Sequence, residues 1–422
     1  MTMTPDGYRS RCMDPLIDKM LEAFGAVCIE GPKSCGKTWL ALNHASSSIM
    51  ISDPAGGFEN RKLVKLDPHY AFTGDVPHLI DEWQDIPFLW DAVRAEVDRS
   101  TDNGRFILTG SSTPVRKGIM HSGAGRIGGI RMRTMSLYES GDSSGDVSLM
   151  DLFNHTLQFT KTKKIDLEHL IYLTVRGGWP RNINLKADAA VLANRGYLET
   201  CLNDAAALDG KGRNKSKLEM VVRSLARNES STATVSKILS DVTEGSVSDK
   251  ATIHYLDVLD RMFLINDQLP FDPNFRSSVR VGKTVKRHLA DPSLAAAAMN
   301  LTPVKLLKDL HTYGFLFEAM CERDLDVYAQ SLGGTLYHYR DLDGREIDAV
   351  LELSDGRWGA FEIKLGADQI DEAAKKLIAI NKYFESRGAR VPSFLCVVCG
   401  LSSAAYLRED GVYVVPINCL KN

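Results

Sequence analysis

The stretch Gly31-Pro32-Lys33-Ser34-Cys35-Gly36-Lys37-Thr38 decides the fold of the first part of this 422-residue chain. It matches G-x-x-x-x-G-K-[ST] at every fixed position, the pattern of a P-loop between a strand and a helix. The surrounding residues fit that context, because they predict an apolar strand at residues 26–30 and a helix at residues 38–45. A glycine-bearing turn before a helix, the simpler interpretation, would not require all four fixed positions.

The chemistry of this loop is phosphate binding. Glycines let backbone N–H groups turn toward phosphate oxygens, and the N-terminus of the following helix adds a favourable dipole. We expect Lys37 to reach the β- and γ-phosphates and Thr38 to give its hydroxyl to Mg²⁺. The sequence therefore predicts that residues 31–38 bind ATP with Mg²⁺ and that the chain hydrolyses the nucleotide.

A P-loop enzyme needs a second acid at the end of a strand. Leu79-Ile80-Asp81-Glu82 offers one. We expect Asp81 to hold Mg²⁺, often through water, and Glu82 to polarise the attacking water. Two acids after an apolar pair are common, so this signal gains its weight from the P-loop that precedes it.

Two further positions bear on hydrolysis. Residues 106–112 predict an apolar strand that ends in hydroxyl side chains, where Ser111 could sense the γ-phosphate; the alternative is a turn or cap cluster. Arg126, displayed after Gly123 and Gly125, could act on the nucleotide of a neighbouring subunit as an arginine finger. The alternative is that Arg126 is a solvated surface residue. Only the first interpretation requires a homo-oligomer.

The order of elements predicts several domains. Alternation of apolar strands and helices in the first part indicates a parallel α/β sheet. Helical patterns follow from about residue 149 to 228. Residues 235–241 and 248–262 then predict two helices, the second with Ser248 as its N-cap, and residues 263–268 predict a strand. This helix, helix, strand order resembles a winged-helix module.

The last part has a different pattern. We expect a helix, three strands joined by short Asp/Gly turns, a second helix and two more strands. These elements are placed at residues 316–329, 335–339, 347–353, 358–364, 370–384, 393–398 and 412–417.

Four motifs together resemble prokaryotic AAA+-type P-loop ATPases that carry a C-terminal domain of unassigned function. They are GPKSCGKT (31–38), LIDEWQ (79–84), FILTGS (106–111) and MSLYES (135–140). GGWP (177–180) is similar to the Gly-x-Pro element of the related lid domains, which implies a position near the nucleotide.

The C-terminal part of this family resembles nucleases of the PD-(D/E)XK type. On that resemblance Asp348 and Glu362 would hold one or two Mg²⁺ ions with the carbonyl group of Ile363, and Glu318 would be the additional acid. Lys364 would position or deprotonate the water that attacks a phosphodiester. Side chains two apart on a strand share a face, so Glu362 and Lys364 should point together. Two alternatives stay open: charges alternating on the outer face of a sheet, and a nuclease fold that binds DNA without cutting it.

A basic stretch precedes this part, with no acid from residue 276 to 288. If it is a hairpin beside the winged helix, its cations could lie against DNA phosphates. The alternatives are a solvated loop or a basic surface packed on the protein's own acidic ATPase domain. The cations are Arg276, Arg280, Lys283, Lys286 and Arg287.

Composition limits the remaining possibilities. The formal charge of −3 argues against a polybasic coat, and no apolar run approaches the roughly 18 residues of a membrane span. The first ten residues lack the apolar core of a signal peptide. Eight scattered cysteines suit a reducing, cytoplasmic setting, and the pair Cys396 and Cys399 is best explained by packing in a strand.

These observations predict an α/β protein: a P-loop (AAA+-like) parallel sheet at 1–145, a helical lid at 146–217, a winged-helix-like module at 218–290 and a restriction-endonuclease-like domain at 291–422. The expected function is ATP hydrolysis directed at DNA, with a metal-dependent nuclease-like domain. The alternative is an ATP-switched signalling or scaffold protein whose C-terminal domain binds DNA or protein without cutting.

Overall fold

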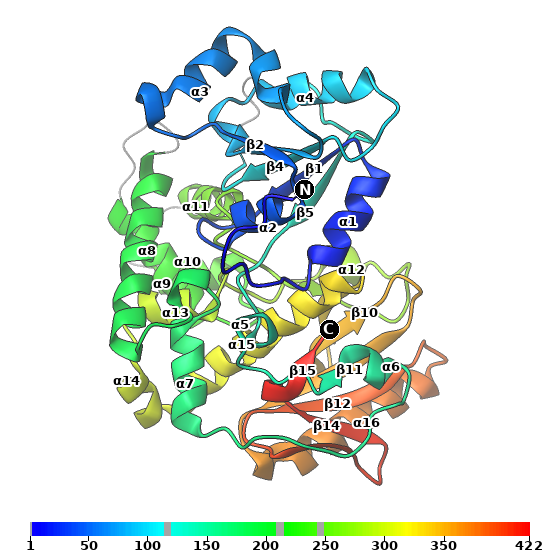
Figure 1. Cartoon of the computed structure of the whole chain (residues 1–422). Coiled ribbons are helices and arrows are strands. Elements are labelled where there is room, and N and C mark those ends of the chain that lie inside the picture. The colour runs from blue at the N-terminus through cyan, green and yellow to red at the C-terminus, as the bar shows by residue number, and fades with distance from the viewer. Residues whose placement is uncertain (1, 114–119, 208–214, 243–248) are drawn as a thin grey trace. The chain divides into compact units, whose positions relative to one another are not determined.

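The computed structural model describes residues 2–113, 120–207, 215–242 and 249–422 (Figure 1). The chain divides into two compact units. Unit 1 comprises Met1–Thr134 and Arg261–Leu264, and unit 2 comprises Met135–Asp260 and Ile265–Asn422. In the described ranges, the helices are too short or too polar to cross a membrane. The predicted N-cap Ser248 lies outside the described residues.

Unit 1 is built on a parallel sheet. In the part of unit 1 that the structure describes, five strands pair in the order β2-β3-β4-β1-β5, and every pair is parallel. The strands are β1 (Ala26–Glu30), β2 (Ser47–Met50), β3 (His78–Asp81), β4 (Phe106–Gly110) and β5 (Ile127–Arg131). The helices are α1 (Asp14–Ala23), α2 (Lys37–His44), α3 (Ala55–Leu66) and α4 (Leu89–Asp98).

Burial explains why this sheet forms. β1 and β4 are apolar along most of their length and buried, as strands covered on both faces are. Because parallel strands end at the same edge, the residues after β1, β3 and β4 lie along one edge of the sheet. The predicted parallel sheet is confirmed, and its edge carries the P-loop, Asp81 and the hydroxyl residues after β4.

Unit 2 contains a mixed sheet. Among the described residues, eight strands pair in the order β7-β13-β14-β12-β11-β10-β9-β8. The sheet has two halves that share β11. In one half, β9, β10 and β11 pair antiparallel, and in the other, β11, β12 and β14 pair parallel. The strands of unit 2 are β6 (Val147–Ser148), β7 (Thr160–Lys161), β8 (Leu269–Pro270), β9 (Thr335–Arg340), β10 (Glu346–Glu352), β11 (Trp358–Lys364), β12 (Phe394–Cys399), β13 (Ala404–Leu407), β14 (Val412–Pro416) and β15 (Leu420–Lys421).

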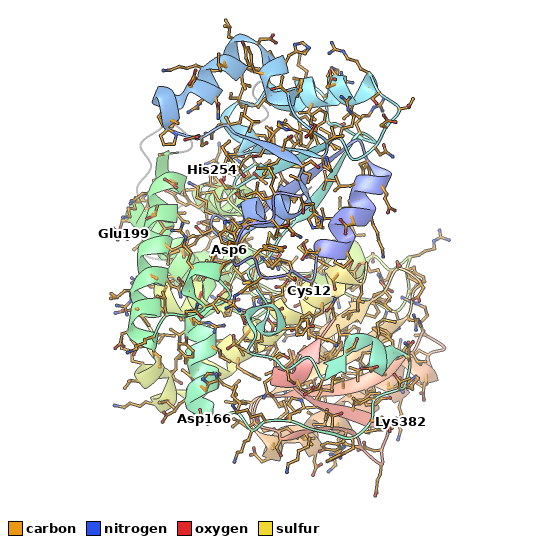
Figure 2. All side chains as sticks on the ribbon, viewed as in Figure 1. Asp6, Cys12, Asp166, Glu199, His254 and Lys382 are labelled. Atoms are coloured by element: carbon orange, nitrogen blue, oxygen red, sulfur yellow. The ribbon has the colours of Figure 1, made fainter. Side chains whose placement is uncertain are left out.

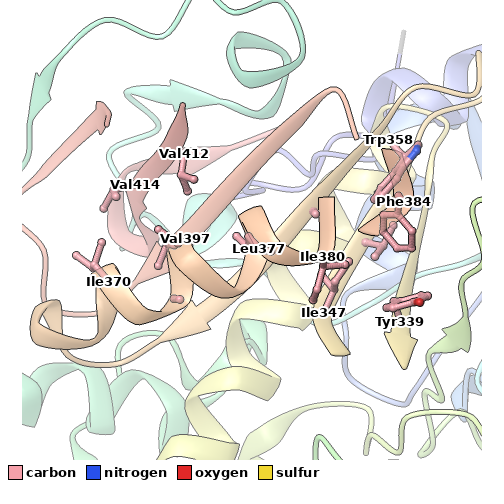
Figure 3. Packing of buried hydrophobic residues seen from close by; sticks show 14 of the residues in the cluster. Tyr339, Ile347, Trp358, Ile370, Leu377, Ile380, Phe384, Val397, Val412 and Val414 are labelled. Atoms are coloured by element: carbon pink, nitrogen blue, oxygen red, sulfur yellow. The ribbon is translucent and has the colours of Figure 1, made fainter. Parts of the chain in front are cut away.

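One helix covers a face of this sheet and closes its core. Figure 3 shows α16 (Ile370–Ser386) along the strands, with Leu377, Ile380 and Phe384 turned toward them. Its buried residues recur every three or four positions, which is the spacing of one helix face. Trp358 is 1% exposed and meets the Phe384 ring at a centroid distance of 5.9 Å. Burial of each such large side chain stabilises the fold by about 1.5–3 kcal/mol.

The other helices of unit 2 occupy the middle of the sequence and the approach to the sheet. Asp166 begins α7 as its N-cap, accepting a hydrogen bond from the backbone N–H of His169 at 2.7 Å (Figure 2). These helices are α5 (Leu137–Ser140), α6 (Leu149–Phe153), α7 (Leu167–Arg176), α8 (Ala187–Ala207), α9 (Lys215–Arg227), α10 (Val235–Asp241), α11 (Asp249–Arg261), α12 (Val279–Gly282), α13 (Pro292–Ala298), α14 (Pro303–Lys308) and α15 (Leu310–Ser331).

The predicted elements of the C-terminal part are present, in the predicted order. The pattern did not indicate the strands β13 and β15 or the helices α13 and α14. The middle part differs from prediction at two places. Residues 154–166, within the predicted helical stretch, are not helical and include β7. Residues 263–268 do not form a continuous strand but pair with residues 286–289 through isolated antiparallel bridges, Ile265 with Leu289 and Gln268 with Lys286. Phe263, at φ 57°, interrupts the extended backbone there.

Candidate functional site

Two glycines fix the loop that follows β1. A Cβ at Gly31 would lie 2.5 Å from the carbonyl oxygen of Met132, so a side chain does not fit. Gly36 is the N-cap of α2 with φ 107°, a left-handed conformation that favours glycine. The loop therefore leads into the N-terminus of an eight-residue helix, whose first N–H groups lack partners within the helix and suit an anion.

The ammonium group of Lys37 lies inside this loop. Its Nζ donates hydrogen bonds to the carbonyl oxygens of Gly31, at 3.0 Å, and Pro32, at 2.9 Å, and the residue is 4% exposed. A second cation supports the loop from outside. Buried Arg11 donates to the carbonyl oxygens of Cys35 and Arg133, each at 3.0 Å. Arg11 was not among the predicted residues, because nothing in its local sequence connects it to a loop 20 positions later.

Asp81, at the end of β3, is directly joined to the P-loop. Its Oδ1 accepts hydrogen bonds from Thr38 Oγ1 at 2.8 Å and from Thr109 Oγ1 at 2.7 Å. Burial raises the pKa of Asp81 above its ordinary value, and these two hydrogen bonds oppose that rise. A hydroxyl and a carboxylate oxygen placed side by side are the hard donors that Mg²⁺ prefers. Thr38 and Asp81 therefore fit a Mg²⁺ ion of the nucleotide.

Glu82 is held in an uncommon conformation. It has φ 57° and ψ 47°, in the left-handed region that non-glycine residues rarely adopt at a cost of about 1–3 kcal/mol. Its Oε2 accepts hydrogen bonds from Ser111 Oγ at 2.9 Å and from the amide of Gln84. Its backbone N–H donates to Thr109 Oγ1 at 3.0 Å. The structure thus brings Glu82 and Ser111 together, as the motifs predict, and adds Gln84 and Thr109.

Arg126 lies away from this cluster. It immediately precedes β5, whose first residue pairs with the first residue of β1, so it stands at the sheet edge opposite the P-loop. Its Nε donates to Asp98 Oδ1 at 2.8 Å, and its side chain is 49% exposed. This position excludes a role for Arg126 at the nucleotide site of its own chain and leaves the role in a neighbouring subunit as a prediction.

The GGWP element is fixed within unit 2. Gly178 accepts a hydrogen bond from the N–H of Met135 at 2.7 Å and donates its own N–H to Asp291 at 3.0 Å. A Cβ at Gly178 would lie 2.0 Å from the Met135 carbonyl oxygen, so the two segments can approach only because residue 178 is glycine. The element therefore anchors the MSLYES segment, and its expected position near a nucleotide stays a prediction.

A second cluster lies on the mixed sheet of unit 2. Asp348 on β10 accepts a hydrogen bond from the backbone N–H of Ile363 at 2.8 Å. On β11, Lys364 Nζ lies 2.9 Å from Glu362 Oε1 and 3.6 Å from Asp348 Oδ2. Glu362 and Lys364 therefore point together, as predicted. Because Glu362 is 0% exposed, the alternative of charges alternating on an outer sheet face is excluded.

Two more lysines enter this cluster, and neither was predicted to belong to it. Lys376 Nζ, from α16, lies 2.7 Å from Glu362 Oε1. Lys286 pairs with Glu318 and, at 2.6 Å, with Glu322 on α15, and it donates to the carbonyl oxygen of Asp348 at 3.2 Å. Glu318 is thus brought to the cluster, but as a partner of Lys286.

The electrostatics of this cluster divide its acids. Burial, with the nearby charge of Asp348, raises the pKa of Glu362 to about 7. Burial also raises the pKa of Glu322, to about 8. Burial acts in the same direction on Asp348, but Lys286 and the other lysines outweigh it and hold the pKa of that carboxyl below its ordinary value.

The donor set fits a metal ion only in part. Glu362 Oε2 is buried and without a hydrogen-bond partner among the described residues, which suits a cation ligand. Yet within the described ranges, no three His, Cys, Asp or Glu side chains are arranged to hold a metal ion. Lys286 already neutralises Glu318, so Asp348 and Glu362 are the residues that fit a divalent cation, and Glu318 does not.

The basic stretch is not a free hairpin. Three of its five cations pair with acids of unit 2 and not with acids of the predicted ATPase unit, and a contact of the stretch with DNA stays a prediction. Arg280 forms two hydrogen bonds with Glu352, at 2.9 and 3.1 Å, and Arg287 pairs with Asp267. Lys286 is buried in the cluster described above. Most of the acids that bind these cations are distant in sequence; the exception is Asp267. The sequence therefore did not indicate that these cations form ion pairs. Arg276 is exposed.

Comparisons with known proteins agree with the first cluster. Residues 23–140 match the model of an AAA domain family. Unit 1 contains an AAA-type P-loop ATPase domain. Residues 167–305 and 313–420 match two domains of unknown function, DUF8612 and DUF4143.

Two similar proteins from mycobacteria are described as uncharacterized proteins. One protein of Mycobacterium bovis and one of Mycobacterium tuberculosis are each 25% identical over 342 residues, which cover 80% of this chain and 70% of theirs. The solved structure of a Walker-type ATPase of Pyrococcus abyssi aligns with 70% of this chain and 97% of its own, at 13% identity and a TM-score of 0.45.

Proposed function

We propose that this chain hydrolyses ATP and uses the reaction in an activity on DNA. The observation that carries the first part is the hydrogen bond of 2.8 Å from Thr38 to Asp81, which joins the P-loop to the second acid. Residues 31–38 bind the phosphates, with Lys37 at the β- and γ-phosphates. A bound Mg²⁺ ion, held by Thr38 and Asp81, would neutralise charge that develops on the phosphates.

Hydrolysis then depends on Glu82. Its Oε2 is oriented by Ser111 and Gln84, so its other oxygen remains available to accept a proton from water. General-base catalysis of this kind contributes about 10²–10⁴-fold to a rate. Ser111 positions this carboxylate and, as the residue after β4, also lies where a γ-phosphate can be sensed.

The test of the ATPase proposal is turnover of ATP by the full chain and by Lys37→Ala. We expect the variant to lose turnover and nucleotide binding while remaining folded, with a somewhat lower melting temperature, because the change removes a phosphate contact and the two hydrogen bonds to Gly31 and Pro32 but no apolar packing. Lys19→Ala, an exposed lysine of α1 in the same unit, is the matched control. Unchanged turnover in Lys37→Ala would refute the assignment of the nucleotide site.

For the second part we propose that unit 2 carries a nuclease-like site at Asp348, Glu362 and Lys364. The support is their convergence on neighbouring strands with Glu362 buried. Asp348 and Glu362 would hold a divalent cation, which activates water and stabilises a phosphodiester transition state when bound. Lys364, within 3.6 Å of both acids, would position the attacking water.

A second candidate function is favoured by one specific observation. Lys376 already binds Glu362, a carboxylate that a metal would need, and Lys286 already binds Glu318, the additional acid of the nuclease resemblance. In that case unit 2 is a DNA- or protein-binding platform whose state is switched by ATP, without cutting. In either form we also propose a cytoplasmic location and a role for Arg126 between the subunits of a homo-oligomer. The proposed domains end at residues 145, 217, 290 and 422, and residues 218–290 form the winged-helix-like module.

Cleavage assays separate the two candidates. Labelled single-stranded, duplex and branched DNAs are incubated with Mg²⁺ or Mn²⁺, with and without ATP, using wild type and Lys364→Ala. Lys382→Ala, an exposed lysine on α16, is the control. Cleavage lost only in Lys364→Ala supports the nuclease, and Mn²⁺ binding lost in Asp348→Asn supports its metal site. Absence of cleavage by wild type on every substrate favours the platform.

A further inference from the structure

A cleft of about 300 Å³ opens beside the second cluster in unit 2. One wall is the segment between α9 and α10, including Thr232, together with Lys237 of α10. The facing wall comes from α15, β9 and β10, and includes Asp348. The cleft is therefore built from the middle module and the C-terminal sheet together. It ends at the carboxylate that the proposed nuclease-like site requires.

An exposed aromatic ring lines this cleft. Phe315 is 41% exposed and lies on α15 three residues before Glu318, so both side chains occupy the same side of the helix. The ring of His311 meets it edge-on at a centroid distance of 5.3 Å. Successive bases of a single strand stack on aromatic side chains of this kind, and such stacking tolerates any base sequence.

Cations lie on both walls. Arg340, at the end of β9, donates from Nη1 to the neutral Thr232 Oγ1 at 2.9 Å, and among the described residues it forms no ion pair. Lys237 lies 3.2 Å from Asp241 but remains 51% exposed. The guanidinium group is thus oriented by a hydroxyl while its charge stays available, which suits a phosphate. The acid Glu346 also lines the cleft and lies 3.9 Å from Lys376, which it shares with Glu362.

We propose that this cleft binds one nucleotide of an unpaired DNA strand, with its base on Phe315 and its phosphates at Arg340 and Lys237. The volume is at the lower end of small-molecule sites, which suits a single nucleotide and excludes a paired duplex segment. The strand would run from the cleft mouth toward Asp348. This inference rests on the proposed action on DNA and names single-stranded DNA as the substrate class.

The test measures binding in EDTA, where cutting cannot occur, by fluorescence anisotropy of labelled oligo-dT and of a duplex of equal length. We expect Phe315→Ala in the full chain to weaken oligo-dT binding about 5- to 150-fold, the equivalent of about 1–3 kcal/mol per stacked base, with duplex binding unchanged. Phe315→Trp should retain the affinity. Phe159→Ala is the matched control, because Phe159 is a 73% exposed aromatic of the same unit.

Arg340→Gln tests the phosphate contact independently. It should weaken oligo-dT binding and reduce the slope of log affinity against log salt by about 0.7, the value for one phosphate contact on a single strand. If the wild type binds DNA and Phe315→Ala binds oligo-dT with the same affinity, the proposed binding of a nucleotide in the cleft is overturned and the proposed function still stands. If wild type binds neither oligo-dT nor duplex, the proposed action on DNA fails as well. Tighter binding of oligo-U than oligo-dT would assign the cleft to RNA and overturn the proposal.

Discussion

Replacement of Thr109 by valine tests the arrangement of the ATPase site most directly. Thr109 is 0% exposed, and its hydroxyl serves both acids of the site. It donates to Asp81 Oδ1 at 2.7 Å and accepts the N–H of Glu82 at 3.0 Å. Valine has nearly the same shape, so Thr109→Val removes these two hydrogen bonds without creating a large cavity.

The size of the effect follows from the two bonds. A hydrogen bond to a charged group contributes about 1.5–3 kcal/mol, and a buried donor left without a partner costs about 1–3 kcal/mol. Asp81 keeps its bond from Thr38, and part of the loss appears as lower stability of the folded state. We therefore expect about 1.4–2.7 kcal/mol to appear in the transition state, which is a 10- to 100-fold lower kcat.

The loss should also change the dependence on Mg²⁺. The hydrogen bond from Thr109 opposes the rise that burial causes in the pKa of Asp81. Without it the carboxylate is no longer held in place by Thr109, so we expect more Mg²⁺ to be needed for half-maximal turnover.

ATP turnover against Mg²⁺ concentration measures both effects. Thr109→Ser keeps the hydroxyl and should behave nearly as wild type, and Thr101→Val controls for the same change at an exposed position. Wild-type kcat and Mg²⁺ dependence in Thr109→Val, or an equal defect in Thr109→Ser, would refute the reasoning.

Two other predictions concern residues outside the P-loop. If Arg126 acts on a neighbouring subunit, Arg126→Ala should lower kcat and leave the ATP affinity nearly unchanged. The turnover rate per chain of the wild type should then rise with protein concentration. A kcat equal to that of the wild type would make Arg126 a surface residue paired with Asp98. Mn²⁺ binding to unit 2 should tighten as pH rises from 6 to 8, because burial raises the pKa of Glu362 to about 7 and the metal must displace that proton. The same raised pKa stabilises the folded state. This contribution to the free energy of unfolding is fully present at pH values below 4.5, the ordinary pKa of Glu362, and is lost as the pH rises through about 7. Titration calorimetry at three pH values measures the binding, and Glu362→Gln should remove the pH dependence.

The sequence predicted those parts of the molecule that depend on contiguous residues. The P-loop is read from eight consecutive residues, and β1 spans the predicted residues 26–30. The strands at 335–340, 346–352 and 358–364 follow from apolar alternation between short Asp/Gly turns. In each case the residues that determine the structure are near neighbours, so their pattern is visible without the fold.

Contacts between distant segments were not predictable in this way. Arg11 reaches the carbonyl oxygen of Cys35, and Lys286 reaches Glu322, 36 positions later. A run of cations without adjacent acids looked like a DNA-binding surface, but ion pairs form in space and leave no local trace. Thr109 lies in the FILTGS motif, but only the folded structure shows that its hydroxyl donates a hydrogen bond to Asp81.

The cluster in unit 2 can serve two functions because its charges are nearly balanced. Its carboxylates and ammonium groups are Glu318, Glu322, Asp348, Glu362, Lys286, Lys364 and Lys376. A divalent cation at Glu362 Oε1 must replace ammonium groups, whereas Oε2 has no hydrogen-bond partner among the described residues. The side chain of Lys376 is 33% exposed and can return to water, whereas that of Lys286 is 7% exposed. Removal of one partner of a buried pair costs about 3–5 kcal/mol, so Lys286 stays in place. Metal binding at Glu362 Oε1 therefore competes with Lys376 and with Lys364, whose side chain is 27% exposed, and the departure of these two ammonium groups separates a binding platform from a metal-dependent site.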